Sequence, residues 1–116
     1  MHSKTTYSVG LFAEFLARTY LRLYGFRIIS SRYITGRHTN RAELDIIARR
    51  RNLLIFVEVK SRPTLTGGLT AVTTSQSARL RRAAETYMLR HGWAGDARFD
   101  IIVVSGWRIK WVRGAI

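Results

Sequence analysis

Two apolar stretches of the chain stand almost back to back, at residues 42–50 (AELDIIARR) and 53–60 (LLIFVEVK). Only Arg51 and Asn52 separate them, and so short a connection lets the two runs pair only as antiparallel strands. We therefore expect a β-hairpin that turns at these two residues. In this register residue 50 lies opposite residue 53, and residue 46 lies opposite residue 57.

The predicted register can be compared with the polarity of each face. Successive side chains of a strand point to opposite faces, so a slip of one residue would mix apolar and charged positions. The register instead collects a wholly apolar set on one face: Ala42, Leu44, Ile46, Ala48, Leu53, Ile55, Val57 and Val59. This agreement supports the hairpin.

The opposite face of the hairpin carries charge. The same count places Asp45 opposite Glu58, and Glu43 opposite Lys60. Carboxylates about 5 Å apart across a sheet repel one another unless a cation lies between them. Lys60 supplies one positive charge, and a hard cation such as Mg²⁺ or Mn²⁺ prefers oxygen ligands of this kind.

Such an arrangement fits metal-dependent hydrolysis of a phosphodiester. Asp45 and Glu58 would bind the metal, with the backbone carbonyl of Val59 as a further ligand, and Lys60 would orient the nucleophile or stabilise developing charge. Glu14 is a possible additional ligand if the first helix packs near the open end of the hairpin. The alternative is a surface ion pair with no chemical role.

The rest of the chain predicts a mixed α/β sheet. An apolar helical stripe covers residues 7–24 and ends at Gly25, and a second one runs from residues 73–75 to about 91. Strands are expected at 26–34, 99–104 and 107–112, with a polar loop at 35–41 and a candidate lid at 61–71. We expect a single domain, 1–116, with one sheet between two helices.

Charge indicates the class of partner. The 20 lysines and arginines outnumber 7 acids and give a formal charge of +13, which favours a polyanion. Nucleic acid, with DNA favoured, is preferred to a membrane surface, because no long basic amphipathic helix is evident. The candidate contacts are arginines of the hairpin tip, the lid and the second helix: Arg49, Arg50, Arg51, Arg62, Arg79 and Arg82.

Two further features concern location. The chain has no cysteine, which fits a reducing cytosol and leaves metal binding to oxygen or imidazole ligands. Glu14 and Arg18 interrupt the apolar residues near the N-terminus, so no signal peptide or membrane span is expected there. We therefore expect a cytoplasmic protein.

Four segments resemble the YraN family of bacterial proteins: GLFAE at 10–14, AELDIIA at 42–48, FVEVKSR at 56–62 and RFD at 98–100. The family is similar to restriction endonucleases and archaeal Holliday-junction resolvases. The resemblance implies that Asp45, Glu58 and Lys60 match the Asp…Glu-x-Lys nuclease core, and that Glu14 matches the resolvase helix acid. Two positions depart from the pattern: Ala42 replaces a glycine, and Gln76 stands where the second helix usually brings a lysine.

Three functions remain open from the sequence. The first is a Mg²⁺- or Mn²⁺-dependent endonuclease for branched or unusual DNA, with Asp45, Glu58, Lys60, Glu14, Glu43 and Gln76 at the site. The second is a nucleic-acid-binding module without turnover, and the third is a scaffold that meets a protein partner at a sheet edge. A homodimer is expected only by analogy with resolvases. Asp100 either supports the site or makes a structural hydrogen bond.

Overall fold

The computed structural model describes residues 2–36, 41–65 and 74–115. Residues 37–40 of the expected polar loop and 66–71 of the expected lid lie outside these ranges. The described elements, in chain order, are α1 (His2–Leu23), β1 (Arg27–Thr35), β2 (Ala42–Arg50), β3 (Leu53–Ser61), α2 (Thr74–Arg90), β4 (Asp96–Ser105) and β5 (Arg108–Val112).

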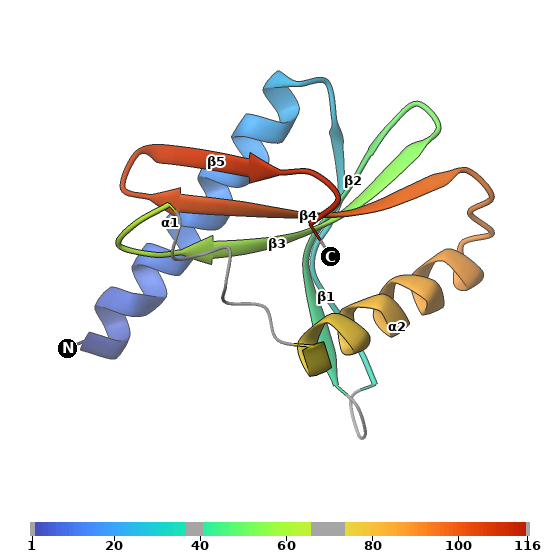
Figure 1. The fold of residues 1–116 in the computed structure, drawn as a ribbon, viewed down its shortest axis with the longest axis horizontal. Coiled ribbons are helices and arrows are strands. Elements are labelled where there is room, and N and C mark those ends of the chain that lie inside the picture. Colours follow the sequence, from blue (N-terminus) through green and yellow to red (C-terminus); the bar gives the residue numbers. More distant parts are fainter. Residues whose placement is uncertain (1, 37–40, 66–73, 116) are drawn as a thin grey trace.

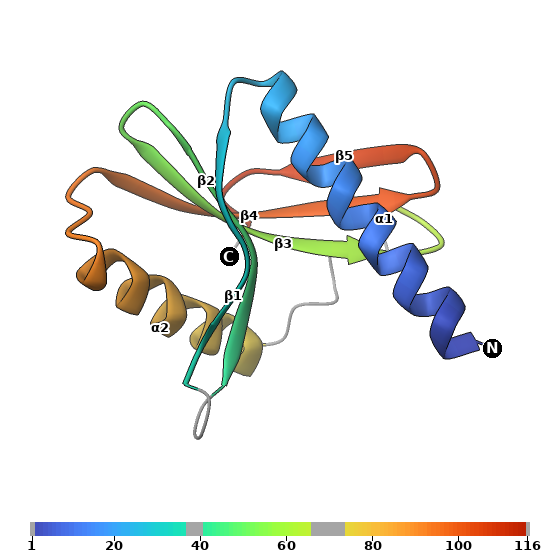
Figure 2. The same ribbon diagram turned by 180° about the vertical axis from the view of Figure 1, so that it is seen from behind.

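The five strands form one mixed sheet in the order β1-β2-β3-β4-β5. Only β3 and β4 pair in parallel, because α2 lies between them in the chain and carries it back to the other end of the sheet. Helix α1 lies across one face and α2 lies on the other (Figures 1 and 2). This α/β fold confirms the expected sheet flanked by two helices and is consistent with a restriction-endonuclease-like arrangement.

A glycine ends α1 and turns the chain into β1. Gly25 has a φ of 87°, a left-handed conformation that favours glycine. Its N–H donates to the carbonyl of Arg22, and the N–H of Phe26 donates to that of Leu21, both at 3.0 Å. This pair of bonds is a Schellman motif, which satisfies the last carbonyls of the helix. The sequence predicted this stop correctly.

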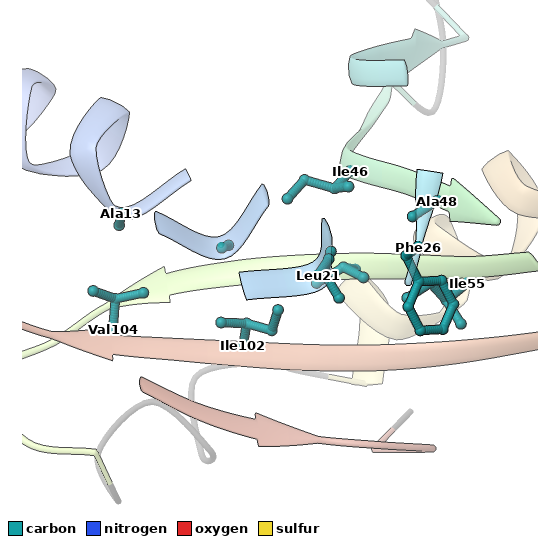
Figure 3. Packing of buried hydrophobic residues seen from close by; sticks show 10 residues of the cluster. Ala13, Leu21, Phe26, Ile46, Ala48, Ile55, Ile102 and Val104 are labelled. Atoms are coloured by element: carbon teal, nitrogen blue, oxygen red, sulfur yellow. The ribbon is translucent and has the colours of Figure 1, made fainter. Parts of the chain in front are cut away.

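Two apolar clusters hold the helices on the sheet. The first lies under α1, where Ala13, Ala17 and Leu21 repeat every four residues and are buried. Small alanines let the helix approach the strands closely. In Figure 3, Leu21 lies near Ile102, and Ala13 lies further along the sheet, toward Val104; all four belong to this cluster. The second cluster lies under α2, around Leu80, Ala84 and Tyr87.

The structure confirms the register near the hairpin tip, where Arg50 pairs with Leu53 and Ile46 pairs with Val57. The ladder goes no further. The expected direct pairings of Asp45 with Glu58 and of Glu43 with Lys60 are therefore not formed as ladder pairs. In Figures 1 and 2, β1 and β2 bend away from β3 and β4 beyond this point.

The expected apolar face is wrong at its open end. Ile46 and Ala48 share a face with Ile55 and Val57 as predicted, and this face packs under α1, whereas Ala42 and Leu44 belong to the cluster under α2. The neighbouring strand is irregular at the same level. Arg32, which lies between the β1 partners of Leu44 and Ile46, has a left-handed φ of 56°. This departure from strand geometry accompanies the change of face.

Several element boundaries differ from prediction. Helix α1 begins at His2 rather than residue 7, and β4 begins at Asp96 rather than residue 99. Polar residues at both starts hid these extensions from a reading of apolar pattern. The ends of β1, β3, α2 and β5 lie within about one residue of the predicted positions.

Candidate functional site

A pocket opens where β2 separates from β3 and α2 crosses the gap. It has a volume of about 320 Å³. Its lining joins three acidic side chains to two arginines and an amide: Arg41, Ala42, Glu43, Asp45, Glu58, Gln76, Arg79 and Leu80. Predicted site residues from β2, β3 and α2 therefore meet in one place, although residues 45 and 76 are far apart in the chain.

Asp45 bridges the opening between the strands. The backbone N–H of Val59 donates to Asp45 Oδ2 at 2.8 Å, in place of a backbone ladder bond at this level. The carboxyl is held near β3, beside Glu58. The two carboxyl groups are therefore close because the Asp45 side chain reaches across the gap to β3, and not because the two residues pair directly across the ladder.

Glu58 is the most buried acid of the pocket, with 8% of its surface exposed. Its Oε2 accepts from two side chains: Lys60 Nζ lies 2.9 Å away and Gln76 Nε2 donates at 3.1 Å. Lys60 is two residues further along β3 and so shares the face of Glu58. Gln76, in the first turns of α2, provides a neutral donor to the same oxygen.

The electrostatics of Asp45 are unusual. Burial and the nearby carboxylate of Glu58 raise the pKa of Asp45 to about 8. The Val59 N–H opposes this shift, and Glu14 adds a smaller contribution in the same direction as Glu58. With no cation between the two groups, Asp45 therefore keeps a proton at neutral pH. Such carboxyl pairs are typical of sites that hold a cation or carry out acid–base chemistry.

Glu14 approaches the site without lining the pocket. Its Oε1 lies 3.0 Å from Arg32 Nε. The helix acid expected from the resemblance is thus close enough to influence Asp45 electrostatically, and is neutralised by an arginine of β1. This arginine could not be predicted from the sequence pattern, because the contact depends on how α1 packs on β1.

The remaining predicted contacts divide between two regions. Arg79 lines the pocket, and Arg82 is exposed one turn further along α2. Arg62 follows β3, where its Nη1 donates to the carbonyl of Ser61 at 2.8 Å. Arg49, Arg50 and Arg51 lie at the hairpin tip, away from the pocket.

Arg41 is a pocket residue that the sequence reasoning missed. It lies directly before β2 and lines the pocket with Arg79. Its position next to the AELD segment was the available signal, but a surface arginine in so basic a chain does not stand out.

The donor set fits a hard divalent cation such as Mg²⁺. Two carboxyl groups, those of Asp45 and Glu58, lie together, and their repulsion helps to raise the pKa of Asp45. Among the described residues no group of three acids or histidines converges to hold a metal. Mg²⁺ usually binds through one or two carboxylates and completes its shell with water and substrate phosphate. Asp45, Glu58 and the Val59 carbonyl would be its protein ligands.

One structural finding bears on membranes. Neither of the described helices combines the length and the apolar content needed to cross a bilayer.

Comparison with known proteins shows the family to which the chain is similar. The family model described as "Uncharacterised protein family UPF0102" matches residues 13–104. A UPF0102 protein of Paramagnetospirillum magneticum is 39% identical over 102 residues, which cover 86% of this chain and 79% of the relative. One from Rhizobium meliloti is 40% identical over 101 residues, covering 85% and 80%. The chain belongs to the UPF0102 family, which is the YraN family that its sequence motifs resemble.

Proposed function

We propose that this protein binds nucleic acid and hydrolyses phosphodiester bonds at the pocket of Asp45 and Glu58, with Mg²⁺ or Mn²⁺ as cofactor. The observation that carries the proposal is the carboxyl pair: the Val59 N–H, 2.8 Å from the Asp45 carboxyl, holds Asp45 beside Glu58, and Glu58 lies 2.9 Å from Lys60. A solvated ion pair would not need a second carboxyl group held against it.

The pocket has a part for each need of the reaction. The carboxyl groups of Asp45 and Glu58 would hold the metal, which supplies Lewis acidity toward a phosphoryl oxygen and toward bound water. Lys60, fixed by Glu58, is placed to orient the attacking water or to stabilise negative charge. Arg41 and Arg79 line the same pocket and offer planar guanidinium groups to the flanking phosphates.

Gln76 takes a binding role in this proposal. Its amide holds Glu58 Oε2 at 3.1 Å, so it orients a metal-binding carboxylate without adding charge. A lysine at this position would bring a second ammonium group to that oxygen beside Lys60. The neutral amide therefore leaves more negative charge for a cation.

The preference for branched or unusual DNA, the cytoplasmic location and the homodimer remain predictions. The first and the last come from the likeness to resolvases, and the location comes from the composition and the N-terminal sequence. Among the described strands, β1 and β5 lie at the edges of the sheet, where a second copy or another protein could pair.

Cleavage assays with the purified protein test the proposal. Duplex, flap and four-way-junction DNA are incubated with Mg²⁺, Mn²⁺ or EDTA, and we expect metal-dependent cutting of at least one substrate. Lys60→Met should lower the rate on the order of 10²–10³-fold, as does loss of one charge-stabilising donor. Asp45→Asn should abolish cutting, and Glu85→Gln, an exposed change on α2, should leave it unaltered.

A binding module without turnover is the second candidate, and the neutral Gln76 favours it because the pocket has one cation fewer than the resolvase pattern. It predicts salt-sensitive binding that needs no metal, with no cutting of any of the three substrates. Metal-dependent cutting that survives Asp45→Asn would contradict both candidates at this pocket.

A further inference from the structure

Four arginines gather where the hairpin turns, at the end of β2 opposite to the acidic pocket. A hollow of about 580 Å³ is lined by Gly25 and by these arginines, Arg27, Arg49, Arg50 and Arg51. We call the four the arginine notch. Arg27 begins β1, Arg49 and Arg50 end β2, and Arg51 is the first residue of the turn between β2 and β3.

The notch concentrates positive charge at a cost to the fold. The register of β1 with β2 places Arg27 directly opposite Arg49, and like charges directly opposite destabilise a sheet. Among the described residues no carboxylate forms an ion pair with any of the four. Asp96 lines a neighbouring hollow with Arg50 and Arg51 and still makes no such pair. The charge is left for something outside the fold to neutralise.

Two of the guanidinium groups are held in place. Arg49 lies 4.7 Å over the ring of Trp93, and its Nε donates to the carbonyl of Arg51 at 2.8 Å. Arg50 lies 4.5 Å over the ring of Phe26, and its Nη1 donates to the carbonyl of Tyr24 at 2.7 Å. Side chains fixed in this way lose less conformational entropy when they bind a ligand. Each keeps further N–H donors for an anion.

The turn residue itself supports a binding role. Arg51 has a φ of 54°, a left-handed conformation that glycine or asparagine adopts with less strain. A hairpin built only for stability would place one of those residues there. Arg51 is the fourth arginine that lines the hollow.

We propose that the arginine notch binds phosphate groups of a nucleic-acid backbone, and that the same nucleic acid passes over β1, the outer strand of the sheet, to the acidic pocket, since residues 46–48 of β2 are fully buried. Arg49 stacks on Trp93, which packs against the cluster under α2, and α2 also borders the pocket. Asp45 and Arg49 are four residues apart on β2, roughly 13 Å at about 3.3 Å per residue. That distance corresponds to about four base-pair steps measured along the axis of a duplex, at roughly 3.4 Å per step.

The notch thus implies a duplex arm extending at least about four base pairs beyond the cut, at one contact per 3.4 Å step. Binding at the notch does not depend on the proposed cleavage, whereas the path to the pocket rests on it. A wild-type protein that never cuts would remove the second statement and leave the first to be judged by binding alone.

The test measures binding without metal. Anisotropy of a labelled 20-base-pair duplex in EDTA, from 50 to 300 mM salt, is compared for the wild type and Arg27→Gln/Arg49→Gln. The variant should lower the slope of log affinity against log salt by about 2, with a loss on the order of tenfold at 150 mM. The matched control, Arg108→Gln/Lys110→Gln, removes the same charge from exposed positions on β5 and should change both quantities less.

Equal losses in the two double variants would overturn the proposal, because net charge alone would then explain the binding. An amide NMR spectrum checks that each variant is folded. If the double variant does not fold, Arg27→Gln alone, at an exposed position, should lower the slope by about 1. An unchanged slope for that single variant would be equally contradictory.

Two further arms separate the sources of phosphate. Inorganic phosphate should compete with the duplex only weakly, because it offers one group where the backbone offers several. Vesicles of phosphatidylglycerol and of phosphatidylcholine are compared with duplex competitor present in both samples. The protein should then bind the phosphatidylglycerol vesicles no more tightly than the phosphatidylcholine vesicles. If the notch variant loses vesicle binding and keeps duplex affinity, or if free phosphate alone occupies the notch, the nucleic-acid assignment is wrong.

Discussion

At the residue scale, two aspartates of the sheet show how surroundings decide a carboxylate's role. Asp100 is fully buried on β4 and accepts from Arg98 Nε and Nη2, from the indole of Trp111 and from the N–H of Gly114, at 2.8–2.9 Å. It pairs in register with Val57, on the α1 side of the sheet, and so fastens the C-terminal segment rather than supporting the pocket. Asp45 has one backbone donor and faces another carboxyl group.

Loss of the Asp45 proton should therefore lower the free energy of unfolding. Its pKa of about 8 in the fold exceeds its ordinary value of 3.8, so between these values the folded chain holds a proton that the unfolded chain has released. Stability of the metal-free protein should fall as pH rises across this window. Asp45→Asn removes the effect, and we expect it to be more stable than the wild type at pH 8 by on the order of 1–3 kcal/mol.

Thermal unfolding in EDTA at pH 4, 6 and 8 measures this difference. It should grow with pH and be smallest at pH 4, which lies close to the ordinary pKa of 3.8, so that the unfolded chain still holds part of its proton. Glu85→Gln on α2 makes the same chemical change at an exposed position and serves as the control. An Asp45→Asn protein that is less stable than the wild type at pH 8 would mean that the carboxyl group is compensated in the fold.

Asp100→Asn should have the opposite effect. The substitution replaces two charged acceptor oxygens by one neutral acceptor and one donor, which faces the N–H groups of Arg98 or Trp111. Hydrogen bonds to a charged group contribute about 1.5–3 kcal/mol each, so we expect a loss of about 2–4 kcal/mol in urea unfolding. Asp96→Asn, an exposed change on the same strand, is the control. Equal unfolding midpoints for the two variants would contradict a stabilising role of the Asp100 hydrogen bonds.

At the element scale, the hairpin shows what local pattern can and cannot predict. The register from Arg50 to Ile46 followed from the two-residue turn and the alternation of apolar residues. The separation of the strands beyond Ile46 could not be predicted in this way. It depends on the irregular β1 at Arg32 and on the apolar surface of α2, to which Leu44 turns. These are contacts between segments distant in the chain.

The residues of the candidate site likewise fall into those that local pattern predicts and those that only tertiary packing brings together. Asp45, Glu58 and Lys60 could be named from one hairpin, because their spacing places them on neighbouring strands. Gln76 was expected near them only from the family resemblance, and the structure confirms that it contacts Glu58. Arg41 and the Arg32 partner of Glu14 were missed, since only the packed sheet brings these side chains to the site.

The hairpin turn offers a test of strain against function. Arg51→Gly should stabilise the protein by about 0.5–1 kcal/mol, because relief of the left-handed φ outweighs the added freedom of glycine when unfolded. The same change should weaken duplex binding if Arg51 contributes to the arginine notch. Urea unfolding and duplex anisotropy on one preparation measure both effects. A destabilised variant would show that the arginine side chain is needed by the fold itself.

At the scale of the whole molecule, the main electrostatic feature is a positive charge that acidic residues do not balance. The chain of 116 residues has a formal charge of +13. The described residues form only three ion pairs, at Glu14, Glu58 and Asp100. Self-repulsion of this kind destabilises the compact state and is screened by salt. We expect the melting temperature to rise by several degrees between 10 and 150 mM NaCl, on the order of 1 kcal/mol.

Differential scanning calorimetry in a low-salt buffer measures this effect. A short duplex should raise the melting temperature further than NaCl at the same ionic strength, because it binds the folded state. A melting temperature that falls with added NaCl would show that the surface charges stabilise the fold.

The acidic pocket makes one claim on which the rest of the functional account depends, namely that Asp45 and Glu58 hold a divalent cation. A Mn²⁺ titration followed by amide NMR, with wild type beside Asp45→Asn, tests it most directly. We predict paramagnetic broadening centred on Asp45, Glu58 and Val59 in the wild type, and its loss in the variant. Broadening elsewhere, or equal broadening in both proteins, would contradict the metal site at this pocket.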